Sequence, residues 1–154
     1  MGKYRVALVG CGGMGRSHLN TLEKMQDFEV VGLCDVAAES IGKARGICGE
    51  VAGFNDFVKM YDELKPDVVT VATQTRGHHG PAVAALQRGI SVLCEKPIAI
   101  DLQEADEMVQ AAERSGAKLA INQQNHVKPA VRKGLQMVRE GVVGELVTIR
   151  GRNK

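Results

Sequence analysis

Four glycines follow the first apolar run of the chain within six residues: Gly10, Gly12, Gly13 and Gly15. Glycine loses more conformational freedom on folding than any other residue, so this clustering needs a compensating role. The spacing G-x-G-x-x-G between a strand and a helix is typical of a site for a diphosphate. We expect Gly10 to allow the tight turn, Gly12 to let the diphosphate approach the backbone, and Gly15 to let helix and strand pack closely. The N–H groups of Gly13, Met14 and Gly15 would then face the phosphates, helped by the helix dipole.

Asp35 is placed to complete a dinucleotide site. It ends the second apolar run and lies 35 − 15 = 20 residues after Gly15, where a carboxylate is expected to bind the hydroxyls of the adenosine ribose. Its negative charge would repel a 2′-phosphate, and the next residue is Val36 rather than arginine. NAD is therefore favoured over NADP. A ligand-free glycine turn and a solvated acid at Asp35 are the structural alternatives.

A second set of reactive side chains is Glu95-Lys96-Pro97, which follows the apolar run VLC. Ligands of doubly wound sheets bind beyond the carboxyl ends of the strands, so Glu95 and Lys96 are expected beside the nicotinamide half of a dinucleotide. A lysine there can donate a hydrogen bond to a substrate hydroxyl or carbonyl. A cis bond before Pro97 would aim Lys96. By itself, such a tripeptide more often forms a solvated turn.

Short apolar runs alternate with longer segments of helical period. The predicted strands are 4–9, 29–34, 67–72, 90–94 and 117–121, with a short one near 50–53, and the predicted helices lie near 14–25, 37–45, 56–64, 78–88 and 101–115. Uniformly apolar strands joined by helices indicate a parallel sheet covered on both faces. Right-handed crossovers then give an α/β doubly wound fold of the Rossmann type.

Several residues mark where these helices begin and end. Gly89 and Gly116 follow helical runs and are expected to end them. Asp101 is a candidate N-cap that forms a capping box with Glu104, and Asn55 is a second N-cap candidate.

The composition narrows the class of protein. The net charge is +2, the basic residues form no stripe, and aromatic residues make up 3% of the chain, so we expect no nucleic-acid partner. No apolar stretch approaches the ~18 residues needed to span a bilayer, and the first residues lack a signal-peptide pattern, which predicts a cytoplasmic protein without a membrane partner. No metal site is predicted, because no cysteine pair has CxxC spacing; the thiols are expected to be small buried groups in a reducing compartment: Cys11, Cys34, Cys48 and Cys94.

Four segments in order carry a family resemblance: VALVGCGGMGRSHL, VVGLCDV, DVVTVAT followed by His78, and VLCEKPIAI. Together they resemble the N-terminal, NAD(P)-binding half of the Gfo/Idh/MocA oxidoreductases over almost the whole chain. The resemblance implies that Lys96 contacts the substrate and is needed for catalysis. It also implies that Glu95 contacts the nicotinamide ribose.

The chain departs from the family pattern in the loop after the fourth strand. The family often has a Pro-Asn pair before a histidine, whereas this chain has Gln74-Thr75 before His78. The loop, with Thr73, Gln74 and His78, is still expected to line the nicotinamide site. For His78, a helix-start residue without a chemical role is the alternative. After the sixth strand, His126 stands where many members have arginine, and no substrate role is assigned to it.

The resemblance also implies a two-domain parent protein. Residues 1–122 are expected to form the dinucleotide-binding domain, and residues 123–154 a linking helix near 129–140 and a strand at 145–151 that would begin a C-terminal α/β substrate domain, absent or truncated here. An open edge at this strand could pair two copies in a homo-oligomer.

The predicted activity of the parent is hydride transfer between a nicotinamide cofactor and a sugar, polyol or related hydroxy compound. The chain itself is expected to bind cofactor without turnover. A non-catalytic dinucleotide sensor and a CoA- or nucleotide-binding domain are the alternatives, and Lys96 favours the enzyme because a sensor needs no amine beside the nicotinamide.

Overall fold

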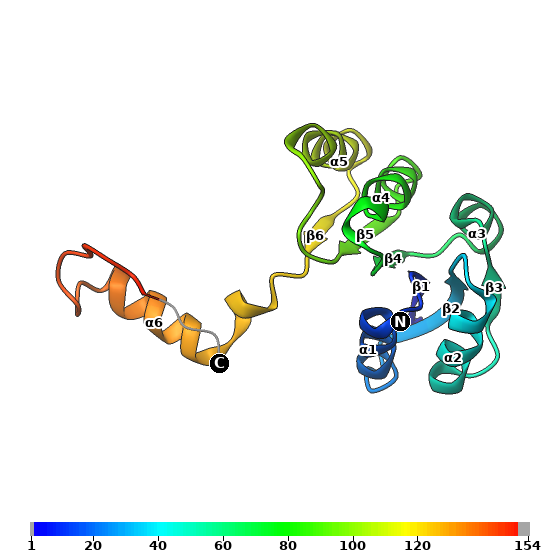
Figure 1. Cartoon of the computed structure of the whole chain (residues 1–154), viewed down its shortest axis with the longest axis horizontal. Helices are drawn as coiled ribbons and strands as arrows, with labels where there is room; N and C mark the ends of the chain where they lie inside the picture. The colour runs from blue at the N-terminus through cyan, green and yellow to red at the C-terminus, as the bar shows by residue number, and fades with distance from the viewer. Residues whose placement is uncertain (1, 151–154) are drawn as a thin grey trace. The chain divides into compact units, whose positions relative to one another are not determined.

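A computed structural model describes residues 2–150. The unit that ends at Asn122 is built on a six-stranded, all-parallel sheet with the order β3-β2-β1-β4-β5-β6 (Figure 1). Its strands are β1 (Tyr4–Val9), β2 (Phe28–Cys34), β3 (Ala52–Phe54), β4 (Val68–Val71), β5 (Ser91–Cys94) and β6 (Leu119–Ile121). The predicted doubly wound Rossmann fold is confirmed.

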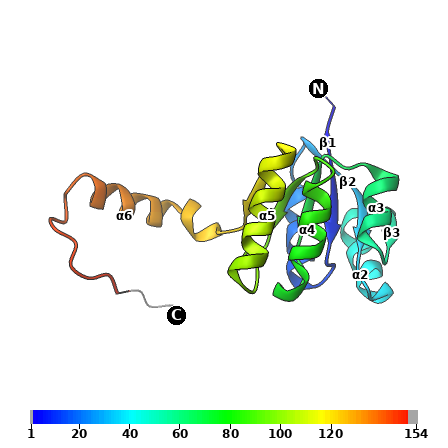
Figure 2. The same cartoon turned by 90° about the horizontal axis from the view of Figure 1, so that it is seen from above.

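Helices cover both faces of this sheet. They are α1 (Gly13–Leu22), α2 (Ala38–Cys48), α3 (Phe57–Leu64), α4 (His79–Leu86) and α5 (Leu102–Ser115), with the short 3₁₀ helix η1 (Thr75–Gly77) before α4. One core cluster joins Leu19 of α1 and Ile41 of α2 to the sheet, and the other joins the buried residues of α3, α4 and α5 to the opposite face. Figures 1 and 2 show α4 and α5 side by side on that face.

The order of the strands creates the site. The chain winds outward from β1 to β3, then returns to β4 on the other side of β1 and winds outward again. The loops after β1 and β4 therefore diverge at the carboxyl end of the sheet, which leaves a crevice between them. Ala72, directly after β4, donates a backbone hydrogen bond to Val9 at 2.8 Å and holds the two loop starts together.

The N-cap of α3 differs from the prediction. The helix begins at Phe57, and its cap is Asp56, whose carboxylate accepts hydrogen bonds from the N–H groups of Val58 (2.8 Å) and Lys59 (3.2 Å). Asn55 is therefore one residue too early to cap, since a cap reaches only the second and third N–H groups of its helix. The cap at Asp101 is confirmed by its bond from the Glu104 N–H at 2.9 Å. Gly116 ends α5 in the left-handed conformation, as expected.

The second unit begins at Gln123 and contains η2 (Gln124–Val127) and α6 (Pro129–Arg139). The predicted helix is confirmed, and residues 145–150 pair with no described strand. The strand at 145–151, expected as the start of a C-terminal domain, stays a prediction. An alternation of apolar residues becomes a strand only where a neighbour supplies its hydrogen bonds. Residue 151 lies outside the described residues. Within residues 2–150, no helix has the length and apolarity to cross a bilayer.

All four cysteines are free thiols. Burial raises the pKa of Cys11 to about 12, with a smaller contribution from the charge of Asp35, and raises the pKa of Cys94 to about 12 and that of Cys34 to about 11. These three thiols are thus buried and protonated, as predicted, while Cys48 is half-buried. No group of three metal-ligating side chains lies close together in the described part of the chain.

Candidate cofactor site

The four glycines of the first turn fall into two pairs. A β-carbon on Gly10, whose φ is 94°, would lie 2.7 Å from the Ala72 carbonyl, and one on Gly15 would overlap the carbonyl oxygen of Gly10. Gly10 and Gly15 are thus required by the packing of the protein itself. Gly12 and Gly13, by contrast, have no protein atom within 4 Å of the position of a β-carbon. The space above this pair is open to a ligand.

The start of α1 offers unpaired donors to that space. The helix begins at Gly13, and its N-cap, Gly12, has no side chain to accept a hydrogen bond. The N–H groups of Gly13 and Met14 have no acceptor among residues 2–150, because the first N–H groups of a helix lack a partner within it. Together with the helix dipole they attract an anion.

Asp35 is held firmly at the end of β2. Its Oδ2 accepts a hydrogen bond from the Cys11 N–H at 2.7 Å, and its Oδ1 accepts one from the Ala37 N–H at 2.9 Å. A carboxylate has about four acceptor sites, so roughly two remain for a ligand. The neighbouring Val36 is 94% exposed and provides no cation.

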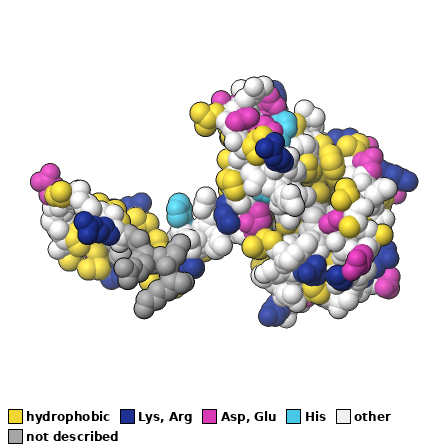
Figure 3. Space-filling view, viewed as in Figure 1, with side chains coloured by type: hydrophobic (Ala, Val, Ile, Leu, Met, Phe, Trp, Pro, Cys, Tyr) yellow, Lys and Arg dark blue, Asp and Glu magenta, His cyan; other side chains and the backbone are white. Residues whose placement is uncertain are grey.

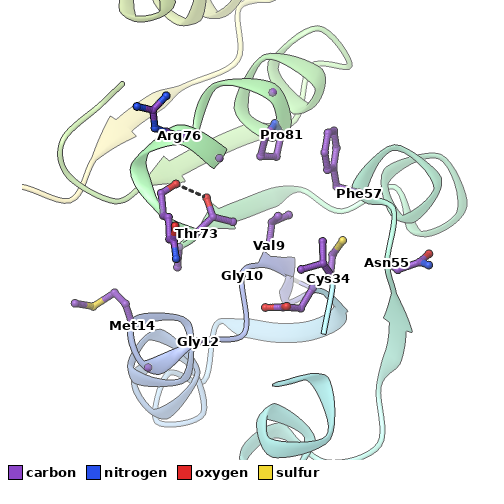
Figure 4. A pocket seen from close by; sticks show the side chains of 17 residues that line it. Val9, Gly10, Gly12, Met14, Cys34, Asn55, Phe57, Thr73, Arg76 and Pro81 are labelled. Carbon is purple, nitrogen blue, oxygen red and sulfur yellow. Dashed lines mark hydrogen bonds between the residues drawn. The ribbon is translucent and has the colours of Figure 1, made fainter. Parts of the chain in front are cut away.

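These groups line one cavity of about 800 Å³ (Figure 4). Its wall brings together eight of the predicted cofactor residues: Gly10, Gly12, Gly13, Met14, Asp35, Val36, Thr73 and Gln74. The sequence reasoning missed several others: Asn55, Phe57, Arg76, Gly80 and Pro81. Asn55 directly follows β3, and Arg76 lies in the loop after β4, so their positions after strands were the signal that could have found them.

Four predicted residues lie outside the cavity wall: Gly15, His78, Glu95 and Lys96. His78 is 1% exposed, with Nδ1 2.9 Å from the carbonyl oxygen of Pro97 and Nε2 3.2 Å from that of Thr73. Its ring therefore braces the loop after β4 against the loop after β5. A neutral imidazole carries one N–H and donates to one of these carbonyls at a time.

Glu95 is the most completely hydrogen-bonded acid of the site. It is 5% exposed, and its Oε1 accepts from Nε2 of His18 at 2.8 Å and from Nδ2 of Asn122 at 2.6 Å. Its Oε2 accepts from the Lys96 N–H at 3.2 Å. Burial pushes the pKa of Glu95 upward, but the hydrogen bonds from Asn122, His18 and Lys96 outweigh it and the pKa ends below its ordinary value. Sequence reasoning missed His18 and Asn122; Asn122 directly follows β6, which is the signal that it carried.

Lys96 continues from this buried acid into solvent. Its side chain is exposed, and the Lys96–Pro97 peptide bond is cis. The charged side chains on the face of the first unit shown in Figure 3 are mixed in sign, without a patch of one charge.

A nicotinamide dinucleotide fits this donor set, and comparison with known proteins points the same way. Residues 4–123 match the model of an oxidoreductase family with an NAD-binding Rossmann fold, the Gfo/Idh/MocA family. The chain belongs to this family. The matched range contains the glycine turn, Asp35 and the Glu95-Lys96-Pro97 segment, whose individual roles stay predictions.

Individual Gfo/Idh/MocA relatives differ in the reaction for which they are named. The chain is 31% identical to a D-apiose dehydrogenase of Paraburkholderia graminis, over 92% of this chain and 38% of that protein. It is 29% identical to glycosyl hydrolase family 109 protein 2 of Akkermansia muciniphila, over 96% of this chain and 33% of that protein. The crystal structure of the WlbA dehydrogenase from Bordetella pertussis, in complex with NADH and UDP-GlcNAcA, superposes with a TM-score of 0.87 at 26% identity, over 92% of this chain and 43% of that one.

The chain thus spans less than half the length of the relatives that it matches. The shared part is the NAD-binding Rossmann domain of the family.

Proposed function

We propose that this chain binds NAD(H) and forms the cofactor half of an oxidoreductase that acts on a sugar, a polyol or a related hydroxy compound. The observation that carries the proposal is the pairing of open helix N–H groups at Gly13 and Met14 with the anchored carboxylate of Asp35 in one cavity. Phosphate and ribose are the two chemical groups that such a pair recognises.

Different residues of the cavity would bind different groups of the dinucleotide. The N–H groups at the start of α1 would hold the diphosphate, and the absence of side chains at Gly12 and Gly13 lets it approach. The remaining acceptor sites of Asp35 would take hydrogen bonds from the adenosine ribose. Thr73 and Gln74, in the loop after β4, line the same cavity.

Asp35 supports NAD rather than NADP. A 2′-phosphate would lie against a carboxylate that already holds its position through two backbone bonds, and like charges in contact are unfavourable. The neighbouring Val36 supplies no compensating charge. Among residues 2–150, Arg76 is the one cation that lines the cavity, and it comes from the loop after β4 rather than from the loop that holds Asp35.

Lys96 is the proposed catalytic residue of the parent enzyme. When bound, the nicotinamide supplies the hydride acceptor or donor. The exposed ammonium of Lys96 would donate a hydrogen bond to the reacting oxygen of the substrate, and Glu95 would contribute its remaining acceptor site to the nicotinamide ribose. His78 would act indirectly, by bracing the two loops. A cytoplasmic location and a homo-oligomer stay predictions.

A sugar substrate is supported by what the relatives share. D-apiose dehydrogenase and the glycosyl hydrolase are both named for carbohydrate chemistry, although for different reactions. A non-catalytic sensor is the competing function. Lys96→Ala separates the two in a protein that joins this domain to a substrate domain. An enzyme loses turnover with little change in NAD affinity, whereas a sensor loses neither regulation nor binding.

Calorimetry on the 154-residue chain tests the proposal, with NAD, NADP and CoA titrated side by side. We expect NAD to bind more tightly than NADP and CoA not to bind. Absence of heat with both pyridine dinucleotides, on folded protein, would contradict the proposal. Tighter binding of CoA would favour a general nucleotide-binding domain. We also expect no steady hydride transfer from sugars or polyols by this chain alone.

A further inference from the structure

We propose that His18 is a positioning residue. It holds Glu95, and through Glu95 the backbone of Lys96, in a fixed position relative to the N-terminal end of α1, where the diphosphate is proposed to bind. This inference rests on the proposed function, since it concerns how the two halves of a dinucleotide site are joined. Neither the glycine pattern nor the Glu-Lys-Pro segment points to a residue in the middle of α1.

The first step is the contact itself. His18 lies on α1, five residues after the helix begins at Gly13, and its Nε2 is 2.8 Å from Oε1 of Glu95, which is 77 residues further along the chain. The pKa of Glu95 is held below its ordinary value, so the acid is ionised at neutral pH and accepts the bond. Nε2 of His18 must therefore donate, which defines the protonated nitrogen of the ring.

The second step is the burial of the acid. Glu95 is 5% exposed, so its charge has little water around it and depends on protein donors. Asn122 supplies one at 2.6 Å, the Lys96 N–H supplies one at 3.2 Å, and His18 supplies the third. Asn122 and Lys96 belong to the same half of the sheet as Glu95. His18 alone reaches it from the helix that begins at the glycine turn.

The third step is mechanical. The Lys96 N–H donates to Oε2 of Glu95, so a rotation of the carboxylate weakens this bond and frees the main chain from which the lysine projects. His18 constrains that rotation from α1. The position of Lys96 relative to the bound diphosphate is then set by one helix, α1, rather than by two independent loops. A functional side chain needs such support from a rigid element.

The test compares His18→Leu, which removes the donor but keeps most of the volume, with His18→Gln, which retains an N–H donor. Asn20→Leu is the matched control, because Asn20 lies exposed on the same helix and bonds only to the Arg16 carbonyl. His18→Ala is a second donor-free variant if leucine does not pack. Thermal melting checks that each variant is folded.

Amide hydrogen exchange of the unliganded chain is the first measurement. We expect the Lys96 amide to exchange about tenfold faster in His18→Leu, and to stay near the wild-type rate in His18→Gln and Asn20→Leu. Amides of β4 should be unaffected. An unchanged Lys96 amide in folded His18→Leu overturns the proposal, and this result needs no ligand.

Binding of NAD and of ADP is the second measurement, because ADP has the diphosphate but lacks the nicotinamide riboside. We expect His18→Leu to weaken NAD about tenfold while ADP stays within about twofold, with recovery in His18→Gln. Equal weakening of both ligands would show a damaged helix and overturn the positioning role. If the wild-type chain binds neither ligand, the proposed function fails, and the exchange measurement still decides whether His18 holds Glu95.

Discussion

Gly12 and Gly15 are three residues apart in the chain and differ completely in their surroundings. Gly15 faces the carbonyl oxygen of Gly10 at the point where α1 packs on β1, while Gly12 faces open space in the cavity wall. The pattern G-x-G-x-x-G predicted close packing at Gly15 and ligand approach at Gly12. The structure confirms the packing at Gly15 and leaves open space at Gly12, where ligand approach stays a prediction. This difference can be measured.

We expect Gly12→Ala to fold as the wild type does and to bind NAD at least about tenfold more weakly, because its methyl group occupies ligand space. Gly15→Ala should instead lose about 3 kcal/mol of unfolding free energy through overpacking. Urea unfolding and calorimetry on both variants check this. A Gly12→Ala chain with wild-type affinity would show that nothing approaches that backbone.

Asp35 carries the proposed choice of cofactor. Asp35→Asn keeps an oxygen for the N–H groups that anchor the side chain and removes the charge. We expect the ratio of NAD to NADP affinity to fall about tenfold, mostly through weaker NAD binding and relief of repulsion toward NADP. Asp27→Asn, an exposed acid outside the cavity wall, is the control for net charge. An unchanged ratio of the two affinities would show that Asp35 does not determine the preference for NAD over NADP.

At the scale of the elements, the segments between strands and helices place most of the site, and at α3 a single side chain defines where the helix begins. Asp56 caps α3 through two backbone N–H groups, while its neighbour Asn55 lines the cavity. The sequence predicted an N-cap in this segment, but at Asn55 rather than Asp56. Asparagine and aspartate both cap helices well, so the correct residue depends on where the helix begins.

Asp56→Ala should lower the free energy of unfolding by about 1 kcal/mol, since it leaves two N–H groups of α3 without their acceptor. Asn55→Ala should leave stability unchanged and affect only ligand binding. Urea denaturation of the two variants, in the absence of ligand, makes the comparison. A larger loss of stability in Asn55→Ala would reverse the assignment of the cap.

At the scale of the whole molecule, Glu95 links the stability of the fold to pH. Burial raises its pKa, but its hydrogen bonds lower it further, so the folded value lies below the unfolded one. The stabilisation is therefore present above the unfolded value of about 4.3 and is lost as the pH falls through the folded value. The acid joins α1 to the residues that directly follow β5 and β6, so its protonation weakens the contacts among these segments.

Glu95→Gln should destabilise the chain by about 2 kcal/mol at pH 7, because the amide cannot replace all the bonds that the carboxylate accepts. The gap from wild type should narrow as the pH is lowered to about 3.5. Urea unfolding at the two pH values tests this, with Glu29→Gln, an exposed acid of β2, as the control. A gap that is constant with pH would show that the effect of the substitution is steric.

The sequence by itself determined the alternation of strands and helices, the glycine turn, and the acid at the end of β2. These follow from local rules: the period of apolar residues, the steric needs of a turn, and the spacing along one strand–helix–strand unit. Only the tertiary structure decided that His78 is buried against the Pro97 carbonyl and that Glu95 bonds to His18. Both contacts join segments far apart in the chain that the parallel sheet brings together at the carboxyl ends of its strands, and no local pattern records them.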